Sequence, residues 1–107
     1  MESDTEVAPD NTVRCAACGH DVTDRRLAIE VSGSHWHRCR NPAGWSFQIG
    51  CFSDAPGCSS DGSATDHATW FPGYAWCFAP CGSCGTHLGW WYLGRDTFVG
   101  LIVSRIR

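Results

Sequence analysis

Two matching stretches, Cys15-Ala16-Ala17-Cys18 and Cys81-Gly82-Ser83-Cys84, indicate how this chain folds. Each Cys-x-x-Cys stretch places two thiolates on one tight turn, and Gly19 and Gly85 stand where such a turn often needs a left-handed residue. Two such turns together supply the tetrahedral sulfur set that Zn²⁺ prefers. Because the protein fills all four ligand positions, we predict one structural zinc ion with no hydrolytic role.

The two cysteine pairs lie far apart in the sequence, so a shared metal would tie the start of the domain to its last third. A redox-active pair is one alternative, but it would need only one such pair and a thioredoxin-like βαβ context, which the sequence does not show. Disulfides are a second alternative, if the eight cysteines meet an oxidising compartment. The other cysteines lack paired spacing, and most are expected to be small buried apolar residues: Cys39, Cys51, Cys58 and Cys77.

Length and charge limit the classes of protein that this chain can represent. Its 107 residues fit one domain, in which residues 1–12 are expected to form a disordered acidic tail and residues 13–107 the folded domain. The sequence has no Lys/Arg cluster, no apolar run long enough for a membrane span and no secretory signal at its start. We therefore expect a cytoplasmic monomer without a nucleic-acid or membrane partner.

The residue pattern is typical of β-structure, since no long segment keeps a helical apolar period. The clearest alternation runs over residues 45–51 and 88–93, where every second residue is large and apolar. We predict an all-β domain of two small antiparallel sheets clamped at one end by the metal. The pattern predicts strands over 26–31, 34–40, 45–51, 88–93 and 98–106, turns at 41–44 and 71–74, and a long loop over 53–69.

Aromatic residues gather around the second cysteine pair. Trp70, Trp76 and Trp90 flank it, and Tyr92 follows two residues later. If residues 71–75 form the loop of a hairpin, Trp70 and Trp76 face each other across its mouth; if only two residues form the loop, they point to opposite faces. A converging set of indoles would form a pocket for a compact neutral ring or for a cation.

The order of these motifs resembles a known family. The stretch WFPGYAW over 70–76, followed by CGSCGTHLGW over 81–90, is similar to the thalidomide-binding (CULT) domain of cereblon. The first cysteine pair and the Asn-Pro turn at 41–44 stand where that family has them, and the resemblance spans residues 13–107. Without the further domains of cereblon, the chain resembles a free-standing single-domain homologue of the bacterial type.

The resemblance implies a β-tent fold, in which two antiparallel sheets meet at a steep angle and are pinned by zinc. It implies a non-catalytic module whose three tryptophans form a cage over Tyr92 for the glutarimide ring of thalidomide-type drugs, a uridine-like imide, or a cyclic imide at a modified protein C-terminus. It also implies backbone contacts from Ala68 C=O and Trp70 N–H, with Asn41 near the exposed part of the ligand. A side-chain contact from His67 stays open, because it is displaced by one position from the family's histidine.

Three other functions fit parts of the sequence. An enzyme related to methionine-R-sulfoxide reductases would use Cys39, close before Asn41, although His37 stands where that family has an arginine. An aromatic-cage reader of quaternary ammonium groups would need an acidic residue at the rim, for which Asp66 is the candidate. A bare interaction module would have the metal site and no pocket.

Overall fold

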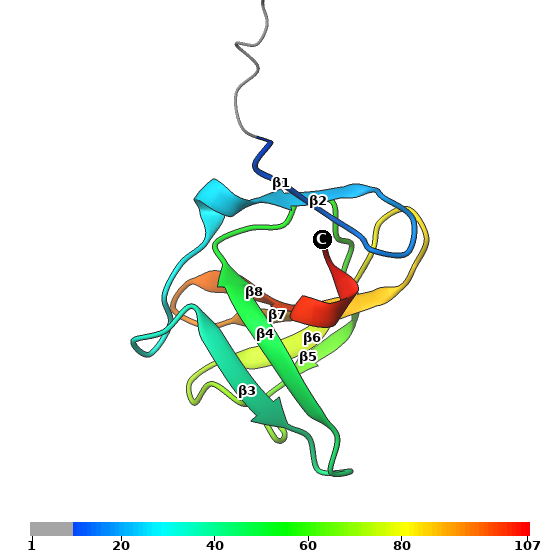
Figure 1. Ribbon diagram of the computed structural model, residues 1–107. Helices are drawn as coiled ribbons and strands as arrows, with labels where there is room; N and C mark the ends of the chain where they lie inside the picture. Colours follow the sequence, from blue (N-terminus) through cyan, green and yellow to red (C-terminus); the bar gives the residue numbers. More distant parts are fainter. Residues whose placement is uncertain (1–9) are drawn as a thin grey trace, which may run out of the picture.

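The computed structural model describes residues 10–107, and its architecture is all-β with two antiparallel sheets, which confirms the predicted fold class (Figure 1). The predicted tail lies mostly outside the described residues, and Thr12 is the first residue of a strand. The smaller sheet pairs β1 (Thr12–Arg14) with β2 (Asp21–Asp24). The larger sheet has the order β3-β4-β8-β7-β6-β5. Its strands are β3 (Trp36–Arg40), β4 (Ser46–Phe52), β5 (Asp61–Thr65), β6 (Ala75–Pro80), β7 (His87–Leu93) and β8 (Thr97–Ile102).

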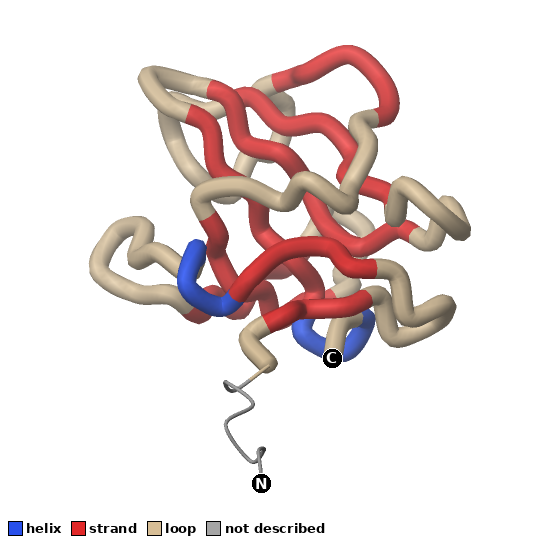
Figure 2. The backbone as a smooth tube through the Cα atoms, turned by 90° about the horizontal axis from the view of Figure 1, so that it is seen from above, coloured by secondary structure: helices blue, strands red, loops and turns tan. Residues whose placement is uncertain are grey.

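The larger sheet is strongly bent, so that β3 and β4 run steeply across the direction of β5 and β6 (Figure 1). Figure 2 shows the curved strands and the two short helical turns from above. Its central strands approach closely at glycines. A Cβ at Gly89 in β7 would lie 1.9 Å from the carbonyl oxygen of Gly100 in β8. Only glycine fits at position 89. The bend of the sheet brings β3 and β4 near the segment that precedes β6.

Three predicted boundaries are wrong, each for a local reason. Residues 26–31 do not form a strand, because the Asp24 carboxylate accepts from Arg26 N–H at 2.8 Å and caps a single 3₁₀ turn, η1 (Arg25–Leu27). The predicted loop 53–69 contains β5, an exposed edge strand without apolar alternation that forms by pairing with β6. The last strand ends at Ile102, where a second 3₁₀ turn, η2 (Val103–Arg105), begins.

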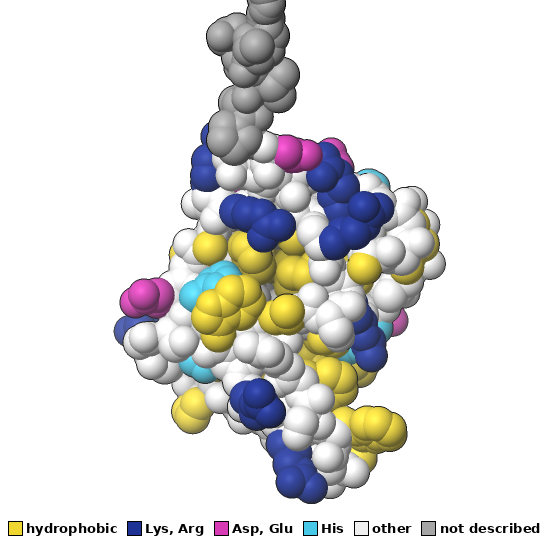
Figure 3. Space-filling model, viewed as in Figure 1, with side chains coloured by type: hydrophobic (Ala, Val, Ile, Leu, Met, Phe, Trp, Pro, Cys, Tyr) yellow, Lys and Arg dark blue, Asp and Glu magenta, His cyan; other side chains and the backbone are white. Residues whose placement is uncertain are grey.

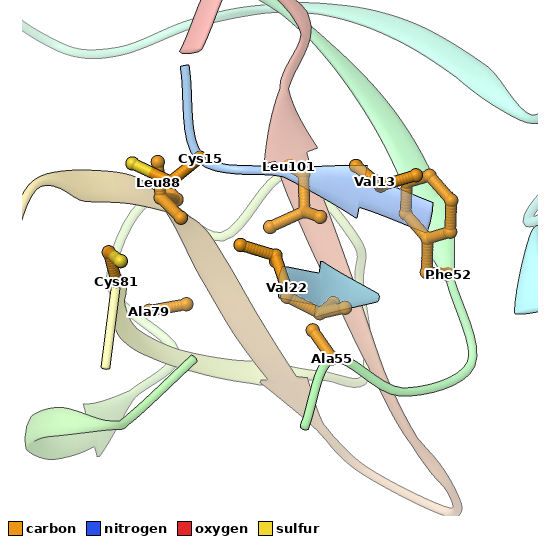
Figure 4. Close-up of a cluster of buried hydrophobic side chains, with 10 residues drawn as sticks. Val13, Cys15, Val22, Phe52, Ala55, Ala79, Cys81, Leu88 and Leu101 are labelled. Atoms are coloured by element: carbon orange, nitrogen blue, oxygen red, sulfur yellow. The ribbon is translucent and has the colours of Figure 1, made fainter. Parts of the chain in front are cut away.

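Two groups of buried side chains form the core. The first lies between the small sheet and strands β7 and β8 (Figure 4). The second lies inside the bend of the large sheet and includes Ile49, Trp90 and Tyr92. Strand β7 serves both, because Leu88 packs in the first group while Trp90 and Tyr92 pack in the second. Each such side chain contributes about 1.5–3 kcal/mol when fully buried.

The C-terminal residues pair with the start of the domain. Arg14 and Arg107 exchange two backbone hydrogen bonds of 2.8 Å, and Ala16 N–H donates to the Arg105 carbonyl at 3.0 Å. The first cysteine turn is therefore held from two sides, by β2 and by the end of the chain (Figure 1). Among the described residues, no helix has the length and apolar character needed to cross a membrane.

Candidate metal site and ligand-binding cavity

The four paired cysteines converge at one end of the first core group. All four Sγ atoms lie within 4.8 Å of one another. Cys15 Sγ lies 3.8 Å from Cys84 Sγ, and Cys18 Sγ lies 3.7 Å from Cys81 Sγ. A tetrahedral site with metal–sulfur bonds of about 2.3 Å has sulfur–sulfur edges of roughly 3.8 Å. The side chains therefore fit a metal ion held by four sulfurs.

The two cysteine turns have the same backbone geometry. Gly19 N–H donates to Cys15 C=O at 2.8 Å, and Gly85 N–H donates to Cys81 C=O at 2.9 Å. Both glycines are left-handed, with φ of 80° and 78°. An L side chain rarely adopts this conformation, which explains why glycine follows each pair. The repeated geometry aims both pairs of sulfurs at one point.

Hydrogen bonding lowers the pKa of one of the four clustered thiols, Cys84, whereas burial raises the pKa of the neighbouring Cys58. The Thr86 hydroxyl and backbone N–H donate to Cys84 and lower the pKa of its thiol to about 6, which favours the thiolate that metals bind. The backbones of Cys58 and Cys81 form an isolated antiparallel β-bridge, but burial raises the pKa of the Cys58 thiol to about 12. Cys58 therefore remains a neutral core residue beside the site. All eight cysteines are free of disulfides.

A cavity of about 350 Å³ opens inside the bend of the large sheet. Its walls come from four separate segments: the β3–β4 turn, β4, the loop before β6, and the paired strands β6 and β7. The lining is mainly aromatic and carries no carboxylate from the described residues. It consists of Asn41, Pro42, Phe47, Ala68, Trp70, Trp76, Phe78, His87, Trp90 and Tyr92.

Trp90 is the central wall of this cavity. It is 8% exposed, and three rings meet it edge-on. The ring centroids of Trp70 and His87 each lie 4.8 Å from that of Trp90, and that of Phe47 lies 5.2 Å away. Edge-to-face contacts of this kind each add about 0.5–1.5 kcal/mol beyond area burial. The packing therefore fixes the walls of the cavity in perpendicular orientations.

The indole N–H groups of the other two walls are already bonded to backbone. Trp70 Nε1 donates to Arg40 C=O at 3.0 Å, and Trp76 Nε1 donates to His67 C=O at 2.8 Å. Both rings are thereby tethered, and neither indole N–H is free for a ligand. Within residues 10–107, in contrast, no hydrogen bond involves Ala68 C=O or Trp70 N–H. Both backbone groups are therefore free to bond to another molecule.

The sequence left open whether Trp70 and Trp76 face each other across a hairpin or point to opposite faces of it. The turn is closed by Tyr74 N–H donating to Phe71 C=O at 3.0 Å, with Pro72 and Gly73 at its centre. Trp76 lies on β6, but Trp70 precedes the turn outside any strand. Strand alternation does not apply to Trp70, and both indoles line the same cavity despite the short turn.

Most sequence-predicted site residues meet in this cavity, and one does not. The structure places Asn41, Ala68, Trp70, Trp76, Trp90 and Tyr92 on its wall. His67 is not among the lining residues; its side chain is exposed, and its role is to hold Trp76 through its carbonyl.

Four lining residues were missed by sequence reasoning: Pro42, Phe47, Phe78 and His87. Strand register could have indicated Phe78, which follows Trp76 by two residues on the same face of β6 and pairs with Trp90. Phe47 likewise shares a face with Ile49 on β4. No sequence signal marked His87 as part of a cavity.

The titratable groups of the cavity are neutral near pH 7. Burial, together with the Arg105 guanidinium, lowers the pKa of His87, and its Nδ1 is buried without a hydrogen-bond partner in the described residues. Burial raises the pKa of Tyr92. Cys39 lies on β3 against the second core group, and burial raises the pKa of its thiol to about 11. This thiol is protonated at neutral pH and is not activated as a nucleophile.

An all-β domain with a four-cysteine site and an aromatic cavity can be compared with known proteins. No family model matches the chain. Cereblon of Xenopus tropicalis is 38% identical over 73 residues, covering 63% of this chain and 16% of that protein. Cereblon of Gallus gallus is 38% identical over 50 residues, or 47% of this chain and 11% of that protein. Cereblon of Danio rerio is 36% identical over 50 residues, covering 12% of its length.

These similarities support a cereblon-like (CULT) domain in this chain, as the sequence motifs predicted. The chain spans less than a fifth of the length of the curated relatives it matches.

Proposed function

We propose that this chain is a non-catalytic binding module whose cavity takes a neutral cyclic imide. One observation carries the proposal: Trp70, Trp76 and Trp90 line one cavity together with Ala68, and within residues 10–107 the Ala68 C=O and the Trp70 N–H have no hydrogen-bond partner. A cyclic imide offers a ring N–H between two carbonyls. Its N–H would donate to Ala68 C=O, and one carbonyl would accept from Trp70 N–H.

The cavity walls would then bind the apolar part of the ring. Methylene groups placed against the indoles gain about 25 cal/mol per Å² of apolar surface removed from water. Because His87 and Tyr92 are neutral near pH 7, no residue that lines the cavity carries a charge to pair with an ionised ligand. A ring-opened, anionic acid would lose its hydration without compensation and should bind more weakly than the intact imide.

Two alternatives receive less support. A reader of quaternary ammonium groups would be expected to place a carboxylate at the cavity, but Asp66 is not among the lining residues. A sulfoxide reductase would require a reactive thiolate at Cys39, and the thiol there has a pKa of about 11. The proposal therefore keeps Asn41 and the three tryptophans in a binding role.

We further propose zinc as the metal of the four-cysteine site, in a structural role. The turn that carries Cys81 and Cys84 joins β6 to β7, and these strands present Trp76 and Trp90 to the cavity. A closed four-sulfur site leaves no position for water or substrate. The metal would therefore set the geometry of two cavity walls and take part in no reaction.

Ligands that share the imide unit are the proposed partners. They include the glutarimide of thalidomide-type drugs, uridine-like imides and a cyclic imide at the C-terminus of a modified protein. Residues 41 and 42 come from the β3–β4 turn and would lie beside the part of the ligand that leaves the cavity. A cytoplasmic, monomeric protein remains the prediction made from the sequence.

The proposal is tested by titrating the protein with glutarimide, N-methylglutarimide and tetramethylammonium, using calorimetry and tryptophan fluorescence. We expect glutarimide to bind and the N-methyl compound to lose about 1–3 kcal/mol, because the methyl group removes the donor to Ala68 C=O and leaves this acceptor unpaired once the ligand covers it. A preference for tetramethylammonium would overturn the imide proposal. If no ligand perturbs the indoles, the chain is better described as a bare interaction module.

A further inference from the structure

His87 lies on the cavity wall because the pairing of β7 is interrupted. Side chains of a regular strand alternate between faces, so His87 and Trp90, three residues apart, would point to opposite faces. The register shifts at this point. Ala79 of β6 pairs with Gly89, whereas the next residue, Pro80, pairs with His87. The one extra residue in β7 forms a bulge, which re-aims the side chains beside it. The ring of His87 therefore meets that of Trp90 edge-on at 4.8 Å and lines the same cavity.

Neighbouring contacts hold both the backbone and the ring of His87. The Arg105 guanidinium donates to the His87 carbonyl at 2.9 Å. The ring packs edge-on against Phe78, with centroids 5.2 Å apart, as well as against Trp90. A side chain fixed in this way loses little conformational entropy when a ligand binds to it.

The two ring nitrogens of His87 have different surroundings. Nδ1 is buried and has no hydrogen-bond partner in the described residues. Nε2 is the nitrogen that stays accessible, on the edge of the ring that the packing leaves open. A neutral imidazole carries one proton, and a proton on Nδ1 would be a buried donor without an acceptor. We therefore assign the proton to Nε2, so that the ring presents an N–H group to the cavity.

A cyclic imide has one more acceptor than the backbone of residues 68–70 satisfies. In the proposed function, its N–H donates to Ala68 C=O and one carbonyl accepts from Trp70 N–H, which leaves the second carbonyl without a partner. We propose that the Nε2–H group of His87 donates to this second carbonyl and makes the cavity selective for imides over lactams, which have a single carbonyl. A site that donates to a ligand's polar atom discriminates against an analogue without that atom. This inference rests on the proposed imide-binding function.

The test measures the preference for glutarimide over 2-piperidinone, the lactam in which a methylene replaces one carbonyl of the same ring. His87→Phe keeps an aromatic ring and removes both nitrogens, whereas His87→Gln keeps an N–H donor near the position of Nε2. We expect His87→Phe to weaken glutarimide binding about tenfold and 2-piperidinone binding by less than about twofold. His87→Gln should keep the wild-type preference within about threefold. Calorimetry measures the affinities, and a thermal melt confirms that each variant is folded.

Phe78→Leu is the matched control, because Phe78 packs against the His87 ring and lines the cavity without a polar side-chain atom. It should weaken both ligands by the same factor and leave the preference unchanged. A second measurement needs no variant. Nitrogen NMR of the wild type should show His87 as the Nε2–H tautomer, and its Nε2 proton resonance should move to higher frequency with glutarimide but not with 2-piperidinone.

The outcomes separate the inference from the proposed function. A wild-type preference in folded His87→Phe, or an Nδ1–H tautomer in the wild type, would overturn the role of His87 while imide binding itself stands. A loss of preference in Phe78→Leu as large as that in His87→Phe would also overturn it, because packing alone would then explain the effect. If the folded wild type binds neither ligand, the proposed function fails and the inference fails with it.

Discussion

The metal site and the aromatic cavity are built in opposite ways. The metal site is two copies of one local motif, and each copy carries the same glycine and the same hydrogen bond. The cavity draws its walls from four segments that share no motif. A repeated local motif fixes geometry within a few residues, whereas the cavity depends on the bend of the large sheet and on tethers such as Trp70 Nε1 to Arg40 C=O. Loss of one cysteine should therefore abolish the metal site as a whole, whereas single substitutions in the cavity should weaken ligand binding by graded amounts.

Removing the proposed zinc ion gives the largest expected effect. Chelation, or the variant Cys84→Ser, should abolish the cooperative thermal transition and imide binding together, because structural zinc sites supply about 10–16 kcal/mol in small domains. Metal content by elemental analysis, a thermal melt and a glutarimide titration measure the three quantities.

Cys58→Ser is the matched control for that experiment, since Cys58 lies beside the site without being one of its four thiolates. It should retain the metal. A metal-free protein that still binds imide would show that the cavity does not depend on the metal site.

The variant Trp90→Ala should have the next largest effect. Truncating a buried tryptophan costs about 3–5 kcal/mol of stability, and here it also removes the ring that three neighbours contact. Denaturant unfolding and calorimetry should show a destabilised protein without detectable glutarimide binding. Trp45→Ala is the control, because Trp45 is 69% exposed and should change stability by less than about 0.5 kcal/mol. Equal effects of the two variants would contradict the central role of Trp90.

A smaller effect is expected from the tether of Trp76. The variant His67→Ala keeps the carbonyl that accepts from Trp76 Nε1 and should bind glutarimide within about twofold of the wild type, since its side chain is exposed. Trp76→Phe removes the indole donor and should weaken binding by about 0.5–1.5 kcal/mol. Calorimetry on both variants separates the backbone role of residue 67 from a side-chain role. A large loss in His67→Ala would assign its side chain to the ligand.

The smallest effect concerns pH. The pKa of His87 is lowered in the folded state, so this residue's contribution is fully present above the unfolded pKa of about 6.5 and declines as pH falls below it. The wild type should lose stability between about pH 6.5 and 5 relative to His87→Phe, as measured by denaturant unfolding at each pH. If stability falls in parallel with pH in the two proteins, His87 does not contribute to the pH dependence of stability.

Local motifs in the sequence were enough to predict the cluster of four cysteines and the Phe71–Tyr74 turn, whereas the grouping of three tryptophans was implied by the family resemblance. Sequence could not predict η1, because a capping carboxylate at Asp24 overrides an apparently alternating segment. It could not predict β5, whose residues follow no apolar pattern and are ordered by pairing with β6. The side on which Trp70 lies depended on tertiary tethers, and Phe47 and His87 reach the cavity only because the sheet bends.

The separation of the two cysteine turns has a consequence for folding. The Cys15–Cys84 contact spans 69 residues, so the first cysteine turn is synthesised long before the second one. Contacts of such long range form slowly, because loop-closure entropy is lost before they stabilise the chain. During this interval each turn presents two thiolates that can share a metal with another molecule. Refolding at high protein concentration with excess zinc should therefore yield metal-linked oligomers, and dilution or a weak chelator should separate them.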